Sequence, residues 1–195
     1  MEISLIRHGK TQVTENSPIT CGDFRKWVEK VDDAGVVEAP VYPVGTLKKM
    51  QDARIVVTSN LKRSIESAKL LGPDLKIIAN PLFREIEFPA LSKPLRGLKL
   101  KPYSWIVIST LLWLGGYANG CESFREARKR AKKAARMLVE YAREYDRVIL
   151  VGHGFFNFLI ATELRKTGWR GKRITSFRHW GCTTYVCLKD SCNQI

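Results

Sequence analysis

The stretch ISLIRHGKT, residues 3–11, and the stretch VILVGHGFF, residues 148–156, follow one plan. In each, a short run rich in Ile, Val and Leu ends near a histidine, and a glycine follows that histidine directly. Short apolar runs of this kind are typical of buried parallel strands. Since the chain has only three histidines, this pattern indicates that His8 and His153 emerge together at one edge of a sheet.

The rest of the chain alternates between strand-like and helix-like segments. Strands are expected at residues 3–6, 54–59, 75–79, 147–152 and 183–189. One helix is expected over residues 61–71, closed by Gly72 and Pro73, and a longer one begins near Ser123. The longer helix has one apolar stripe and a basic face opposite it. The stripe consists of Phe124, Ala127, Ala131, Ala134, Leu138 and either Tyr141 or Ala142. This alternation predicts an α/β domain with a mostly parallel central sheet.

The 195 residues fit one domain, and residues from about 86 to 121 interrupt the alternation as an inserted cap. Within this segment, residues 103–118 contain no charged side chain. The run is too short to span a membrane, which takes about 20 residues. Three interpretations of its apolar side chains remain: part of the core, a contact in a homodimer, or a hydrophobic wall over a substrate.

The chain has 33 Lys and Arg against 19 Asp and Glu, a net charge of +14, which favours anionic partners. Seven of these cations lie within residues 125–136, on the basic helix face. Such faces are usually only solvated, so a small phosphorylated molecule is expected as the partner rather than nucleic acid. The odd number of cysteines, five, and the lack of a secretory signal predict a cytoplasmic location.

The expected strand ends collect the side chains that attack on a phosphate ester requires. In open α/β sheets, ligands bind outside the carboxyl ends of the strands. A neutral imidazole can be the nucleophile if its other ring nitrogen is held by a hydrogen bond, and His8 is the candidate. Arginine suits a phosphate clamp because its planar fork matches phosphate oxygens, and Arg7 and Arg63 are the candidates. Gly9 and Gly154 would let backbone N–H groups approach the anion.

Five blocks of the sequence together resemble a known family. LIRHGKT is similar to the signature of the histidine phosphatase superfamily, which has the phosphoglycerate mutase-like fold. Four later blocks follow in the family's order: TSNLKRSIESAKLL, PLFREIEFPALS, GCESFREARKRA and VILVGHGFFNFLIATEL. The resemblance covers most of the chain and implies a three-layer α/β sandwich with a mostly parallel central sheet and a small cap.

The resemblance also implies roles for individual residues. His8 would be the phosphorylated nucleophile, and Arg7, Arg63 and His153 would form the phosphate pocket, with Gly154 beside them. No metal ion or other cofactor is implied, because cationic side chains neutralise the phosphate in this family. The third histidine, His179, has no supporting pattern and is expected to be solvated or to have a capping role.

The family's general acid aligns with Glu85, and Glu87 is the lesser candidate because it would point to the opposite side of an extended segment. Glu15 and Asp23 are further acidic candidates. The sequence departs from the family at Thr14, where many members have Asn.

The resemblance favours a metal-independent phosphatase that hydrolyses phosphomonoesters through a phosphohistidine, since the mutases of this family are longer. Two enzymatic alternatives are a phosphoglycerate mutase-type phosphotransferase and a protein phosphohistidine phosphatase. A non-catalytic polyanion-binding module is the alternative from another class.

Overall fold

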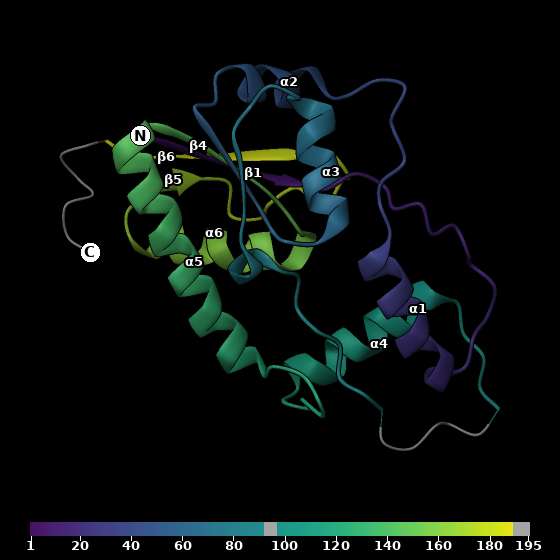
Figure 1. The fold of residues 1–195 in the computed structure, drawn as a ribbon. Helices are drawn as coiled ribbons and strands as arrows, with labels where there is room; N and C mark the ends of the chain where they lie inside the picture. The colour runs from purple at the N-terminus through teal and green to yellow at the C-terminus, as the bar shows by residue number, and fades with distance from the viewer. Residues whose placement is uncertain (92–96, 189–195) are drawn as a thin grey trace.

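A computed structural model describes residues 1–91 and 97–188. Within these residues, six strands form one sheet in the order β3-β2-β4-β1-β6-β5 (Figure 1). Their bounds are Glu2–Arg7 (β1), Ile55–Thr58 (β2), Ile77–Ala79 (β3), Arg147–Gly152 (β4), Arg170–Gly171 (β5) and Cys182–Val186 (β6). Strands β1 to β4 are parallel, whereas β6 is antiparallel to β1 and to β5. The mostly parallel sheet is confirmed. Lys189, the last residue of the expected final strand, lies outside the described residues.

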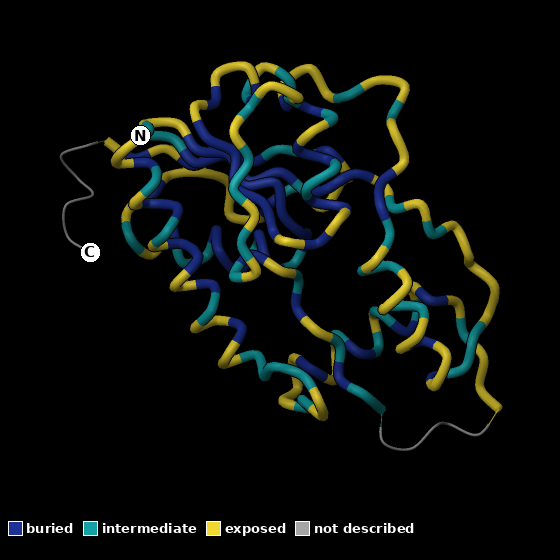
Figure 2. Tube along the Cα trace, in the orientation of Figure 1, coloured by how far each residue is buried: buried dark blue, intermediate teal, exposed yellow. Residues whose placement is uncertain are grey.

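Helices cover both faces of the sheet, as a three-layer sandwich requires. Helices α5 (Phe124–Tyr145) and α6 (Gly154–Lys166) lie on one face, and α2 (Val44–Gln51) and α3 (Lys62–Leu71) on the other (Figure 1). Side chains alternate along each strand: Leu5 packs into the core under α5 and α6, and Ile6 into the core under α2 and α3. The central strands are therefore buried on both faces (Figure 2).

The long helix α5 begins where the sequence predicts. Ser123 accepts a hydrogen bond from the backbone of Glu126, and the Glu126 side chain accepts one from the Ser123 backbone, which forms a capping box. The buried residues of α5 are Ala127, Ala131, Ala134, Ala135, Leu138, Val139 and Ala142. Ala142, rather than Tyr141, completes the buried stripe, because Tyr141 is only partly buried.

Two helices lie beyond the carboxyl ends of the parallel strands. Helix α4 (Pro102–Leu114) belongs to the expected cap segment, and it packs against α1 (Cys21–Asp33) through Trp105 and Phe24 (Figure 1). Helix α1 is not among the helices expected from the sequence. Its buried or partly buried apolar side chains, Cys21, Phe24, Trp27, Val28 and Val31, recur at three- and four-residue steps, so the sequence contained a helical signal that the interpretation did not use.

The segments that join the cap to the sheet include a short 3-10 helix, η1 (Pro81–Phe83). Backbone hydrogen bonds in both directions link Ile19, ahead of α1, with Leu100, ahead of α4. Among the helices of the described residues, none combines the length and apolar character that crossing a bilayer requires.

The strand register brings three chain segments to one edge. Arg7 at the end of β1 pairs with Gly152 at the end of β4, so His8 and His153 follow at adjacent places. Strand β6 is antiparallel to β1 and begins opposite its end, where Cys182 pairs with Ile6. The residues that precede β6 therefore reach the same edge.

Candidate active site

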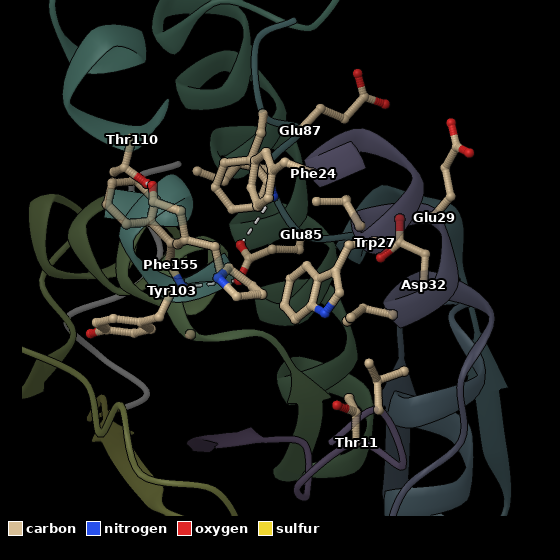
Figure 3. A pocket seen from close by; sticks show the side chains of 18 of the residues that line it. Thr11, Phe24, Trp27, Glu29, Asp32, Glu85, Glu87, Tyr103, Thr110 and Phe155 are labelled. Atoms are coloured by element: carbon tan, nitrogen blue, oxygen red, sulfur yellow. Dashed lines mark hydrogen bonds between the residues drawn. The ribbon is translucent and has the colours of Figure 1, made fainter. Parts of the chain in front are cut away.

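A cavity of about 960 Å³ opens at this carboxyl edge. Its floor consists of Arg7 and His8 at the end of β1, Arg63 and Gly154 in the first turns of α3 and α6, Glu85 after η1, and His179 ahead of β6. Its wall comes from α1, α4 and the segment 86–91, and Figure 3 shows side chains of both parts. His153 is fully buried and does not line the cavity.

The His8 ring is buried at the floor and held in one tautomer. Its Nδ1 lies 2.7 Å from the carbonyl oxygen of Gly9. Because a carbonyl only accepts hydrogen bonds, Nδ1 must donate, and in a neutral ring the lone pair is then on Nε2. Burial lowers the pKa of His8 well below its ordinary value, and the positive charge of Arg63 lowers it further. The ring is therefore neutral near pH 7 and has a nucleophilic Nε2.

His153 lies directly behind His8. The two ring centroids are 5.1 Å apart, with the planes inclined at 61°. Its Nε2 lies 2.7 Å from the Ser59 hydroxyl and 3.3 Å from that of Ser64, while Nδ1 is buried without a partner among the described residues. Burial, followed by the neighbouring His8, lowers the pKa of His153 well below its ordinary value. If a serine hydroxyl donates to Nε2, the neutral ring presents an unpaired N–H at Nδ1.

The two arginines are fixed by other parts of the chain. Arg7 donates to the carbonyl oxygen of Phe177, and its Nε is buried without a partner among the described residues. Burial lowers the pKa of Arg7, and the nearby Glu85 opposes that effect. Arg63 donates from one nitrogen to Asp32 at 2.8 Å and to the carbonyl of Val31 at 3.1 Å. Arg63 begins a helix, where a cation needs a nearby anion, and Asp32 is such an anion.

The glycine after His8 does not have the role that the sequence interpretation gave it. Its N–H donates to the Ser67 hydroxyl at 2.9 Å, so this group is not directed at a ligand in the present arrangement. A Cβ at Gly9 would lie 2.0 Å from the Trp180 ring. Glycine is therefore required here by a packed tryptophan, whereas Gly154 does line the cavity.

Glu85 links the floor to the start of α6. Its Oε1 accepts hydrogen bonds from the backbone N–H groups of Phe156 and Ile86, and its Oε2 accepts one from Phe155 (Figure 3). A carboxylate at a helix N-terminus is electrostatically favourable. The Glu87 carboxylate points away from this group (Figure 3).

The other acidic candidates differ in their relation to the cavity. Glu15 lines it and is paired with Lys30, whereas Asp23 does not line it and accepts from Thr20. Thr14 also lies outside the lining, but Asn16 contributes to it.

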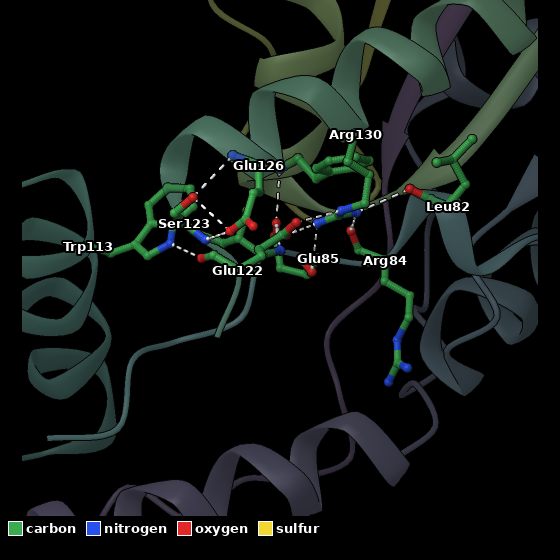
Figure 4. A network of polar contacts seen from close by, with 10 residues as sticks. Leu82, Arg84, Glu85, Trp113, Glu122, Ser123, Glu126 and Arg130 are labelled. Carbon is green, nitrogen blue, oxygen red and sulfur yellow. Dashed lines mark hydrogen bonds and ion pairs between the residues drawn. The ribbon is translucent and has the colours of Figure 1, made fainter. Parts of the chain in front are cut away.

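Arg130 holds the Glu85 segment from behind (Figure 4). It donates to the carbonyl oxygens of Leu82 and Arg84 at 3.1 and 2.7 Å, and more weakly to that of Glu85 at 3.4 Å. It also pairs with the Glu122 carboxylate, and its guanidinium lies 3.8 Å from the centroid of the Phe156 ring. One of the seven cations assigned to a solvated basic face is thus a structural residue.

His179 is the site residue that the sequence interpretation missed. It lines the cavity, its ring centroid is 5.6 Å from that of His8, and its Nδ1 donates to the His8 carbonyl oxygen at 3.0 Å. Burial, followed by the charge of Arg7, lowers its pKa. His179 reaches the site because the final strand is antiparallel, which brings the residues before that strand to the carboxyl edge. Among the described residues, no three His, Cys, Asp or Glu side chains form a metal-binding group.

A neutral histidine with a defined tautomer, beside two arginines at the carboxyl edge of an α/β sheet, is suited to phosphate chemistry. The known proteins that this chain resembles also belong to a family with phosphate chemistry. The chain belongs to the histidine phosphatase superfamily, branch 1, whose sequence model matches residues 3–192. A sequence search of curated proteins finds no match.

Solved structures share the fold at low sequence identity. A phosphoserine phosphatase from Entamoeba histolytica aligns with a TM-score of 0.57 and 15% identity over 95% of this chain and 90% of its own. For a mycobacterial glucosyl-3-phosphoglycerate phosphatase these values are 0.53 and 20%, over 85% and 80%. For the alpha-ribazole phosphatase of Shigella flexneri they are 0.50 and 20%, over 86% and 80%. At such identities the likeness establishes the phosphoglycerate mutase-like fold.

Proposed function

We propose that this protein is a metal-independent phosphatase that hydrolyses phosphomonoesters through a phosphohistidine on His8. The observation that supports this most directly is the 2.7 Å contact between His8 Nδ1 and the Gly9 carbonyl. It leaves the lone pair on Nε2, in a ring that burial keeps neutral. The uncharged ring is the form that can attack phosphorus.

The phosphoryl oxygens would be bound by the groups around this nitrogen. Arg7 and Arg63 supply two guanidinium groups at the cavity floor, where burial strengthens their attraction for an anion. Gly154 lies at the N-terminus of α6, whose dipole favours negative charge. His153 lies behind His8 and does not line the cavity in the present arrangement, but its Nδ1 has no partner among the described residues, and we assign it as a further donor to the bound phosphoryl group.

The reaction takes two displacements. In the first, His8 Nε2 forms a bond to phosphorus while the bond from phosphorus to the ester oxygen breaks, and Glu85, protonated in the complex with the ester, gives its proton to that oxygen. In the second, water attacks phosphorus, gives a proton to the Glu85 carboxylate, and the phosphorus–nitrogen bond breaks. Inorganic phosphate leaves, and both residues return to their starting forms. Oε2 accepts one hydrogen bond and Oε1 accepts two, so Oε2 is the oxygen that can hold the proton.

The test is incubation with a labelled phosphomonoester, followed by rapid quenching. We expect an acid-labile, base-stable label on His8 and release of inorganic phosphate. Stable label on another residue, or turnover without any labelled intermediate under burst conditions, would contradict the assignment.

The same preparation separates the alternatives. With 3-phosphoglycerate, a mutase yields 2-phosphoglycerate, whereas a phosphatase yields inorganic phosphate. A phosphohistidine phosphatase would release phosphate from a phosphohistidine-bearing protein in preference to esters. Salt-dependent retention on nucleic acid without turnover of any phosphate compound would instead favour a polyanion-binding module.

A further inference from the structure

The cavity is much larger than a phosphoryl group requires. Its volume of about 960 Å³ is at the upper end of the roughly 300–1,000 Å³ typical of sites for whole drug-sized ligands. Arg7, His8 and Arg63 occupy only the floor. The remaining volume is available to the part of the substrate that leaves with the ester oxygen.

The wall around this remaining volume is mainly aromatic and aliphatic. Helix α1 contributes Phe24 and Trp27, the segment after η1 contributes Phe88 and Leu91, α4 contributes Ile106, and the first turn of α6 contributes Phe155. Four of these six side chains are aromatic, and Figure 3 shows Phe24, Trp27 and Phe155 around the space next to Glu85. The rings of Phe24 and Trp27 are stacked at 6.1 Å.

The lining carries five cationic side chains and five acidic ones: Arg7, Lys10, Arg25, Arg63 and Arg84, and Glu15, Glu29, Asp32, Glu85 and Glu87. The ion pairs are Glu15 with Lys30, Glu29 with Arg25 and Asp32 with Arg63. Apart from Arg7 and Arg63, the lining has three cationic side chains against five acidic ones, which disfavours a second anionic group on the substrate. The attraction for an anion is concentrated at the floor.

From these observations we infer that the cavity selects phosphomonoesters whose alcohol part is a large apolar group, aliphatic or aromatic. This inference rests on the proposed function and adds the substrate class. Apolar groups gain free energy when they leave water for such a wall. The hydroxyl groups of a sugar of the same size would lose their hydrogen bonds to water there and find few partners.

The first experiment measures kcat/KM from phosphate release with n-alkyl phosphates, from ethyl to octyl. We expect kcat/KM to rise about fourfold for each methylene that enters the cavity. A matched pair separates shape from polarity: cyclohexylmethyl phosphate and glucose 6-phosphate both have a six-membered ring and a primary ester. We expect the cyclohexylmethyl ester to be favoured by at least about tenfold.

Variants then show which side chains cause the rise of kcat/KM with chain length. Ile106→Ala and Trp27→Ala each remove part of the wall and should reduce the gain per methylene. Val107→Ala is the matched control, because Val107 is adjacent on α4 and 43% exposed and does not line the cavity. It should leave the chain-length dependence unchanged. Thermal unfolding of all three variants shows whether the fold persists.

The outcomes separate this inference from the proposed function. Release of phosphate from ethyl phosphate with no dependence on chain length, or preference for glucose 6-phosphate, overturns the inference alone. A gain per methylene that persists in both wall variants while their folds are intact also overturns it. Failure to release phosphate from every ester overturns the proposed function as well.

Discussion

The floor and the wall of the cavity are built by different means. Floor residues such as His8 follow directly from strand ends, so backbone hydrogen bonds between strands set their positions. Wall residues such as Trp27 and Ile106 belong to helices outside the sheet, which contact each other through side chains. We therefore expect changes in the floor to affect every substrate, and changes in the wall to affect the choice among substrates.

The largest effect is expected for His8→Ala, which removes the proposed nucleophile. Turnover should fall by about 10⁴-fold or more for every ester, short or long, and the acid-labile label should disappear. Quench-flow labelling and phosphate release measure both. If acid-labile label remains on the variant, another residue is the nucleophile, and floor variants are no longer expected to affect every substrate.

Glu85→Gln should have the next largest effect, and one that depends on the leaving group. The amide cannot donate a proton as an acid does, so turnover of alkyl phosphates should fall about 10²- to 10⁴-fold, as for other general acids. The loss should be much smaller for p-nitrophenyl phosphate, whose leaving group hardly needs a proton. Equal losses for the two esters would show that Glu85 acts only as the cap of α6.

Arg130→Lys tests whether the floor depends on support from behind. Lysine cannot bond Glu122 and three backbone carbonyls together, so we expect a loss of about 2 kcal/mol in unfolding free energy and roughly tenfold in kcat. Arg125→Lys is the control, since Arg125 is exposed on the same helix. Urea unfolding measures the free energy of unfolding of both variants, and steady-state kinetics measures their kcat. An Arg130→Lys variant as stable and active as the control would show that Arg130 does not support the site.

The lowered pKa values of His8 and His153 predict how stability depends on pH. Both rings stay neutral in the fold, while the unfolded chain binds their protons below about pH 6.5. The unfolded state then holds more protons, so stability is fully present above pH 6.5 and falls as the pH drops, by up to about 1.4 kcal/mol per unit for each histidine.

Urea unfolding at pH 5.0, 6.0 and 7.5 measures this slope. His8→Asn should make the slope shallower, because His8 no longer contributes beside His153 and His179, whose pKa values are also lowered. The same slope in the variant would mean that His8 does not resist protonation in the fold.

The smallest effect is expected for His179→Asn. This side chain donates to the His8 carbonyl and lines the cavity, but the proposed reaction does not use it. Loss of one such contact should lower kcat/KM by roughly threefold to tenfold and leave the label on His8 intact. A loss above a hundredfold would place His179 among the catalytic residues.

The sequence was sufficient for the parts of the molecule that follow backbone periodicity. The β-branched runs that end near His8 and His153 are buried parallel strands, and adjacent strand ends bring the two rings together. The capping box at Ser123 likewise depends on neighbours a few residues apart. In such cases local spacing contains the necessary information.

Other features depend on contacts between distant segments. The Arg63–Asp32 pair joins α3 to α1, and no local pattern connects the two residues. His179 lies in the site because β6 runs antiparallel to β1, and strand direction is not evident from an apolar run alone. The N–H group of Gly9 is occupied by Ser67, which lies 58 positions away.

The bond between Arg63 and Asp32 also joins the floor of the cavity to its wall. Asp32 belongs to the last turn of α1, the helix that presents Trp27, so a substrate that displaces this helix would also move the guanidinium that we propose binds the phosphate. Recognition of the alcohol and acceleration of its release are then mechanically linked. A poorly fitting ester would be handled slowly even when its phosphate is fully bound.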